Sequence, residues 1–174
     1  GGGNVGVNLG TGRLRQGDNR YDFRLGDADF GGFFLDPVDW WGDKAEYSYL
    51  SDFDNGNAGN DASCAIAGAF ALGGAKYCNL GLGEDEVTTA GGDSGGPEFI
   101  DGMIASVTSY GLTFGSGFGD IDNVLNDTFG EFAGFVPVFL HRDFINSVMV
   151  VPAPGTVALA LLALGLMATR RRKA

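Results

Sequence analysis

The distribution of apolar and polar residues favours short strands over helices in most of this chain. Residues 21–25 alternate apolar and polar side chains, as a half-buried strand does. Residues 30–35 and 47–53 are further strand candidates. Before the apolar C-terminal segment, only residues 140–148 have a helical pattern. The pattern therefore predicts a body made mainly of β-strands.

A β-hairpin is the most specific local prediction. Residues 98–100 and 103–108 are two strand-like runs joined by Asp101 and Gly102. An Asp-Gly pair between apolar runs favours a two-residue hairpin turn. Residues 134–138 are expected to form the last strand, directly before the predicted helix.

Composition and charge agree with an acidic all-β domain followed by a tail. The chain has 174 residues, including 31 glycines and 14 phenylalanines, which suits one domain of modest size built as a barrel. Residues 1–148 hold all 22 acidic and seven of the 11 basic residues, a formal charge of −15. Because nucleic acid binding needs a basic face, this balance argues against a nucleic acid partner.

The most informative motif is a glycine-rich turn around one serine, formed by Gly92, Asp93, Ser94, Gly95, Gly96 and Pro97. Glycine leaves open space beside the Ser94 hydroxyl and allows the N–H groups of Gly92 and Ser94 to face one concavity. Such N–H groups stabilise the oxyanion that forms when a serine attacks a carbonyl. A Gly-rich surface turn without a chemical role is the simpler alternative.

This turn resembles the active-serine loop of trypsin-like (chymotrypsin-fold) serine proteases. The strand after it ends in Ser109, Tyr110 and Gly111, which resemble the family's segment that aligns substrate backbone. The resemblance implies an all-β fold: the second six-stranded antiparallel β-barrel of that fold with a closing C-terminal helix. It also implies that Ser94 is the nucleophile and that Thr88 lies at the floor of the primary pocket. A threonine there does not imply cleavage after Arg or Lys.

The general base that Ser94 would need has no upstream candidate. The single histidine, His141, falls in the predicted closing helix, where the family pattern gives it no catalytic role. We therefore expect residues 1–148 to be the C-terminal half of a protease domain whose first barrel, carrying histidine and aspartate, is absent. Alone, this part is expected to be inactive. The alternative is a non-catalytic, surface-sorted β-domain that has lost the triad.

Cys64 and Cys78 are the only cysteines, separated by 13 residues. They lack metal-site spacing, and with one histidine a zinc site is not expected. The choice is between two free thiols and a disulfide. Export would favour the disulfide, and the protease resemblance implies a bridge of similar spacing just before the serine loop.

Residues 52–61 alternate carboxylates and amides on a glycine-broken loop, a pattern that could offer oxygen ligands to calcium. The positions that an EF-hand reserves for glycine and glutamate hold Asn57 and Ser63 instead. The sequence therefore favours an acidic surface turn over a calcium site. No metal and no cofactor is expected.

The C-terminal segment differs from the body. Residues 149–155 form a linker that contains Pro152, Ala153 and Pro154, residues 156–169 are apolar, and residues 170–174 are basic. We expect residues 156–169 to form a hydrophobic transmembrane helix, although this run is shorter than the roughly 20 residues that span a bilayer comfortably. This order resembles the PEP-CTERM sorting signal, which an exosortase-type membrane protease reads. The resemblance implies export to the cell envelope and transient anchoring with the C-terminus in the cytoplasm.

Overall fold

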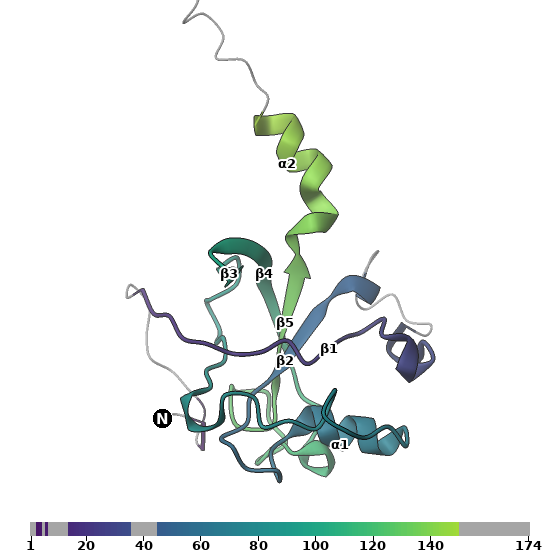
Figure 1. Ribbon diagram of the computed structural model, residues 1–174. Coiled ribbons are helices and arrows are strands. Elements are labelled where there is room, and N and C mark those ends of the chain that lie inside the picture. The colour runs from purple at the N-terminus through teal and green to yellow at the C-terminus, as the bar shows by residue number, and fades with distance from the viewer. Residues whose placement is uncertain (1–2, 5, 7–13, 36–44, 150–174) are drawn as a thin grey trace, which may run out of the picture. The chain divides into compact units, whose positions relative to one another are not determined.

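The computed structural model describes residues 3–4, 6, 14–35 and 45–149. Its strands form one five-stranded antiparallel sheet in the order β1-β2-β5-β4-β3 (Figure 1). The strands are β1 (Phe23–Arg24), β2 (Tyr49–Asp52), β3 (Pro97–Ile100), β4 (Met103–Leu112) and β5 (Phe132–Pro137). The chain divides into two compact units, Gly1–Phe139 and Leu140–Ala174, and the whole sheet belongs to the first.

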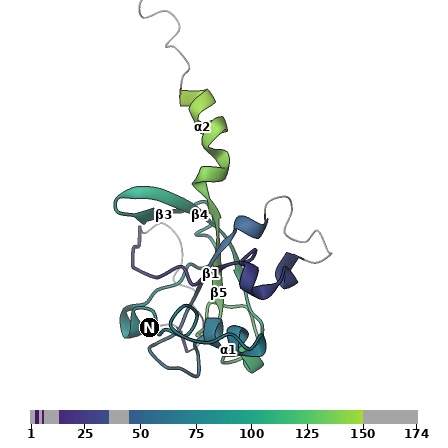
Figure 2. The ribbon, with the colours of Figure 1, turned by 45° about the vertical axis from the view of Figure 1, so that its right-hand side comes forward.

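The β3–β4 hairpin, which the Asp101-Gly102 pair between two strand-like runs predicted, is confirmed. Asp101 and Gly102 have φ angles of 51° and 76°, the left-handed conformations that a two-residue hairpin turn needs. In both ribbon views the hairpin and α1 (Ala62–Ala69) lie at opposite ends of the sheet (Figures 1 and 2). Strand β4 continues beyond the hairpin along β5, with a register shift between Thr108 and Tyr110.

Aromatic side chains dominate the core. Phe23 of β1 lies against Phe30, and both rings also meet Tyr77. Leu50 of β2 and Phe132 of β5 extend this cluster across the sheet, and both are buried. Burial of such rings supplies most of the free energy that holds the sheet and its connecting loops together.

Helix α1 was not predicted, and the expectation of a single helix in the body was wrong. The Asp61 carboxylate accepts a hydrogen bond from the Cys64 N–H and caps the first turn. The following run of small residues has good helix formers but no wide apolar stripe, so periodicity gave a weak signal. Cys64 of α1 forms a disulfide with Cys78, which confirms the disulfide prediction.

Two of the predicted strands were wrong in whole or in part. Residues 30–35 form 3₁₀ turns at Ala28–Phe30 and Phe33–Leu35 instead of a strand. Asp27 caps the first turn and Gly31 ends it in the left-handed conformation, so local capping prevails over alternation. Within residues 21–25, only Phe23–Arg24 pair as strand.

The antiparallel, mostly-sheet architecture is confirmed, but barrel closure is not found. Among the described strands, β1 and β3 are the two edges and do not pair with each other. The predicted C-terminal helix is present as α2 (Arg142–Met149), in the second unit. The predicted apolar helix at 156–169 lies outside the described residues, and no described helix is long and apolar enough to cross a membrane.

Candidate functional site

The turn that carries Ser94 is held by Asp93. The Asp93 N–H donates to the Ala90 carbonyl, and the Asp93 carboxylate accepts from the Ala90 N–H at 2.9 Å. The Asp93 carbonyl accepts from the Gly96 N–H at 2.8 Å, which closes the turn around the serine. Ser94 itself is exposed. The aspartate thus organises the turn, and the serine hydroxyl faces solvent.

Two backbone hydrogen bonds fix this turn to strand β4. The Gly95 N–H donates to the Thr108 carbonyl, and the Thr108 N–H donates to the Gly96 carbonyl, both at 2.9 Å. The Thr108 hydroxyl also donates to the Glu98 carboxylate at 2.8 Å. The structure therefore brings the Ser94 turn beside the start of the Ser109 segment, as an extension of the β3–β4 ladder.

The segment of Ser109, Tyr110 and Gly111 has two exposed residues, and its tyrosine side chain is held inside the fold. Ser109 falls at the register shift of β4 and is exposed, as is Gly111. Tyr110 points inward, where its phenol shares a hydrogen bond of 2.6 Å with the Ser48 hydroxyl. The Tyr110 ring lies so close to Gly134 of β5 that a Cβ atom there would overlap it. This packing fixes the strand whose outer residues were predicted to align substrate.

The N–H groups predicted to hold an oxyanion are available. Within the described part of the chain, the N–H groups of Gly92 and Ser94 donate to no acceptor. Gly92 has a φ of 107°, and Gly95, one residue beyond the serine, has a φ of 88°. Residues with a side chain rarely adopt such angles, so glycine at both positions maintains this turn.

The groups needed to activate Ser94 are not gathered around it in the described part of the first unit. The chain's single histidine, His141, belongs to the second unit and is exposed. Burial raises the pKa of Asp127, and repulsion from the Asp93 carboxylate adds to the rise. Thr88, two residues after Glu86 in the chain, is half-buried.

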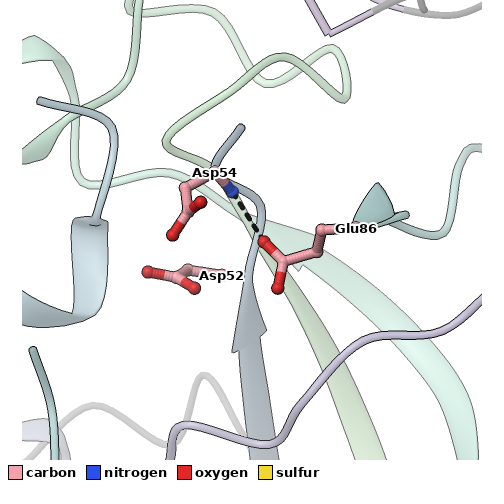
Figure 3. Close-up of side chains that lie close together, drawn as sticks. All are labelled: Asp52, Asp54 and Glu86. Atoms are coloured by element: carbon pink, nitrogen blue, oxygen red, sulfur yellow. Dashed lines mark hydrogen bonds between the residues drawn. The ribbon is translucent and has the colours of Figure 1, made fainter. Parts of the chain in front are cut away.

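A second candidate site lies at the end of β2. The sequence did not predict it because Glu86 is 32 residues after Asp54. Asp52, Asp54 and Glu86 bring carboxylate oxygens within 4.8 Å of one another, and all three residues are buried (Figure 3). The Asp54 N–H donates to Glu86 Oε2 at 3.0 Å, and the Ser63 N–H donates to Asp52 Oδ2 at 3.0 Å. Asp54 Oδ1 accepts from the Gly56 N–H at 2.6 Å, whereas Asp54 Oδ2 has no hydrogen-bond partner in the described chain.

The prediction that residues 52–61 form an acidic surface turn is therefore wrong, because the carboxylates of this loop are buried. Asp52, Asp54 and Asp61 are at most 4% exposed. Burial raises the pKa of all three carboxyl groups, and repulsion from Asp22 adds to the rise at Asp52. Burial also raises the pKa of Glu86 to about 7. The residue that the sequence did not connect with this loop is Glu86, which the fold brings in from after the disulfide.

A third group of carboxylates, Asp120, Asp122 and Glu131, has a structural explanation. The Glu131 carboxylate accepts the N–H groups of Asn126 and Asp127 and the hydroxyl of Thr128. These bonds shape the loop before β5. Asp122 is exposed, so the group is not enclosed.

Comparison of the chain with protein-family models, curated proteins and solved structures found no match.

Proposed function

We propose that this chain is the nucleophile-bearing part of an exported serine endopeptidase of the trypsin-like class. The observation that carries the proposal is the attachment of the Ser94 turn to β4. The exchange of hydrogen bonds between Thr108 and the two glycines after Ser94 leaves the hydroxyl exposed beside an exposed strand residue, Ser109. Free N–H groups at Gly92 and Ser94 support an oxyanion site there.

In this proposal, Ser94 Oγ attacks the carbonyl carbon of a peptide bond while a histidine takes its proton. The carbonyl oxygen becomes an oxyanion that accepts hydrogen bonds from the Gly92 and Ser94 N–H groups. When the intermediate collapses, the C–N bond breaks and the histidine returns the proton to the leaving amine. Water then hydrolyses the acyl-serine ester. The histidine and its aspartate would come from the first barrel that the protease resemblance implies, since the family pattern gives His141 no catalytic role.

Substrate recognition would use the strand next to the turn. Ser109 and Gly111 are exposed residues of β4, and an extended peptide would add by backbone hydrogen bonding on the side that does not face β5. Thr88 would lie at the floor of the primary pocket. Since threonine carries no charge, the proposal assigns no preference for basic residues.

Labelling with a fluorophosphonate tests this proposal. In the full-length product of the gene, an activated Ser94 reacts covalently, and Ser94→Ala abolishes the labelling. Ser116→Ala is the matched control, because Ser116 is also exposed and lies in a glycine-rich loop. Without a base, this 174-residue chain alone is expected to react only at the slow rate of an unactivated hydroxyl. Folded full-length protein that stays unlabelled would reject the proposal.

A non-catalytic binding domain is the second candidate, and two observations favour it. The β3–β4 hairpin exposes Phe99, Ile100, Met103 and Ile104, each by 49% or more. A pocket of about 310 Å³ opens beside it, lined by Asn19, Arg20, Tyr21, Ser51, Glu98, Phe99, Ile100 and Phe135. Exposed apolar side chains next to a pocket are typical of an interaction surface. Absence of labelling, together with loss of partner binding in Phe99→Ser, would favour this function.

We also propose that the tail directs the protein to the cell envelope, where an exosortase-type protease would process it. The support is the order of the Pro-Ala-Pro motif, apolar run and basic end in residues 152–173. Deletion of residues 170–173 should impair membrane orientation and surface delivery, because cytoplasmic basic residues set orientation. Unchanged delivery, measured by surface protease accessibility, would contradict this role.

A further inference from the structure

We propose that Asp52, Asp54 and Glu86 form a binding site for a Ca²⁺ ion. Carboxylate oxygens that lie within 4.8 Å of one another can all reach a single ion, because calcium binds oxygen at about 2.3–2.6 Å. Figure 3 shows the three carboxylates close together, from the end of β2 and from the segment after the short turn Gly83–Asp85. This site is independent of the proposed peptidase activity.

The unpartnered oxygen of Asp54 is the second observation that points to a ligand. Asp54 is 0% exposed, and its Oδ2 atom has no hydrogen-bond partner among the described residues. A buried carboxylate oxygen without a partner is costly, and buried polar groups are almost always satisfied by hydrogen bonds, water or an ion. A cation between the three carboxylates would satisfy this oxygen.

The charge balance around the cluster also favours a cation. None of the three carboxylates forms an ion pair with a lysine or arginine of the described chain, where Lys76 pairs with Asp27 and Asp29 instead. Two more carboxylates lie beside Asp52: Asp22 accepts the Asp52 N–H at 2.8 Å, and Asp61 accepts the hydroxyl of Ser63, whose N–H donates to Asp52. Buried carboxylates of one sign repel each other unless protons or a cation neutralise them.

The ligand types select the ion. All three groups are carboxylates, the hard oxygen ligands that Ca²⁺ prefers, and the cluster has no histidine or cysteine for zinc. Each carboxylate is also held by a backbone N–H: Ser63 for Asp52, Gly56 for Asp54, and Leu82 for Glu86. These bonds orient the carboxylates and leave further lone pairs for an ion. Mg²⁺ is a poorer fit because it needs a strict octahedron and keeps several waters.

Bound calcium would fasten the serine-bearing segment to the sheet. Glu86 begins the irregular stretch that leads to the Ser94 turn, whereas Asp52 ends β2. The Asn19 side chain already joins the same two segments by donating to the carbonyls of Asp52 and Val87. The Asp54 N–H also donates to Glu86, and a shared ion would add a third connection at this position.

Calorimetric titration of the chelator-treated 174-residue chain with CaCl₂ is the direct test. We expect one Ca²⁺ per chain, tighter than Mg²⁺, and a Tm increase of about 5–10 °C when free Ca²⁺ exceeds Kd by about 100-fold. Absence of both binding heat and a Tm shift would overturn the proposal. Equal affinity for Mg²⁺ would overturn the choice of ion.

Variants locate the site. Asp54→Asn and Glu86→Gln should each weaken Ca²⁺ binding at least tenfold, and Asp54→Asn should not lower Tm in chelator because it removes a buried charge. Glu84→Gln is the matched control, since Glu84 is exposed in the turn just before Glu86 and loses the same charge. If Asp54→Asn fails to fold by circular dichroism, Glu86→Asp replaces it and should also weaken binding. Native affinity in the folded variants would overturn the site.

Discussion

Truncation of Phe23 should lower the free energy of unfolding more than any substitution on the surface of the β3–β4 hairpin. Phe23 is 4% exposed and occupies half of the two-residue strand β1. Its ring centroid lies 5.1 Å from that of Phe30, 5.8 Å from Phe132 and 5.9 Å from Phe34. Phe23→Ala removes these contacts and leaves a cavity that the surrounding rings fill only in part.

The expected loss for a buried Phe→Ala change is about 3–5 kcal/mol in the free energy of unfolding. For a domain of this size, the loss corresponds to a decrease in Tm of roughly 6–20 °C. Phe23→Leu should lose only about half as much stability as Phe23→Ala, because most of the apolar volume stays. Urea unfolding and calorimetry of the oxidised protein measure both quantities.

Phe99→Ala is the matched control because the Phe99 side chain is 60% exposed. A surface change of this kind should alter the free energy of unfolding by about 0.5 kcal/mol or less. The reasoning would be refuted if Phe23→Ala cost less than about 1 kcal/mol, or if Phe99→Ala cost as much as Phe23→Ala.

Three further outcomes follow from the described contacts. Reduction of the Cys64–Cys78 disulfide, which closes a sequence separation of 14, should cost about 3 kcal/mol of stability, and a double Ala variant should lose sensitivity to reductant. Burial raises the Tyr77 pKa from 10.0 to about 12, so between these pH values the unfolded chain loses the proton first. Stability should therefore fall as pH rises from 10 to 12, and Tyr77→Phe should flatten this slope in alkaline urea titrations. Gly130→Ala should lower expression of soluble protein and Tm, because φ is +89° and a Cβ would overlap neighbouring backbone.

Local chemistry in the sequence was sufficient where neighbours in the chain are also neighbours in space. The Asp101-Gly102 pair and the runs beside it predicted the β3–β4 hairpin. A two-residue hairpin turn needs positive φ at both residues, and an Asp-Gly pair favours this conformation. The last strand and the C-terminal helix were predicted at 134–138 and 140–148 from the local pattern and the protease resemblance, within two residues of β5 and α2 at either end. In contrast, the capping bonds of Asp27 and Asp61 turned a predicted strand into 3₁₀ turns and produced the unpredicted α1.

The alternation of carboxylates and amides in residues 52–61 also led to a wrong prediction. Asp52 and Asp54 belong to a stretch of carboxylates and amides that has the composition of an exposed turn. Both are buried where β2 pairs with β5 and where the first turn of α1 donates the Ser63 N–H to Asp52, and composition predicts neither contact. Glu86 then approaches from 32 residues after Asp54, a separation at which no local pattern connects the two.

The sequence by itself determined the mostly-β character, the hairpin, the disulfide partners and the exposed glycine turn that contains Ser94. Each depends on local backbone preference or on there being only two cysteines. Tertiary structure alone decided which strands pair, how the Ser94 turn attaches to β4 and which carboxylates meet at the end of β2. The strand pairing and the two sites depend on contacts between residues far apart in the sequence. Burial of Phe23, Leu50 and Phe132 in one core stabilises the sheet and thereby sets which segments lie next to one another.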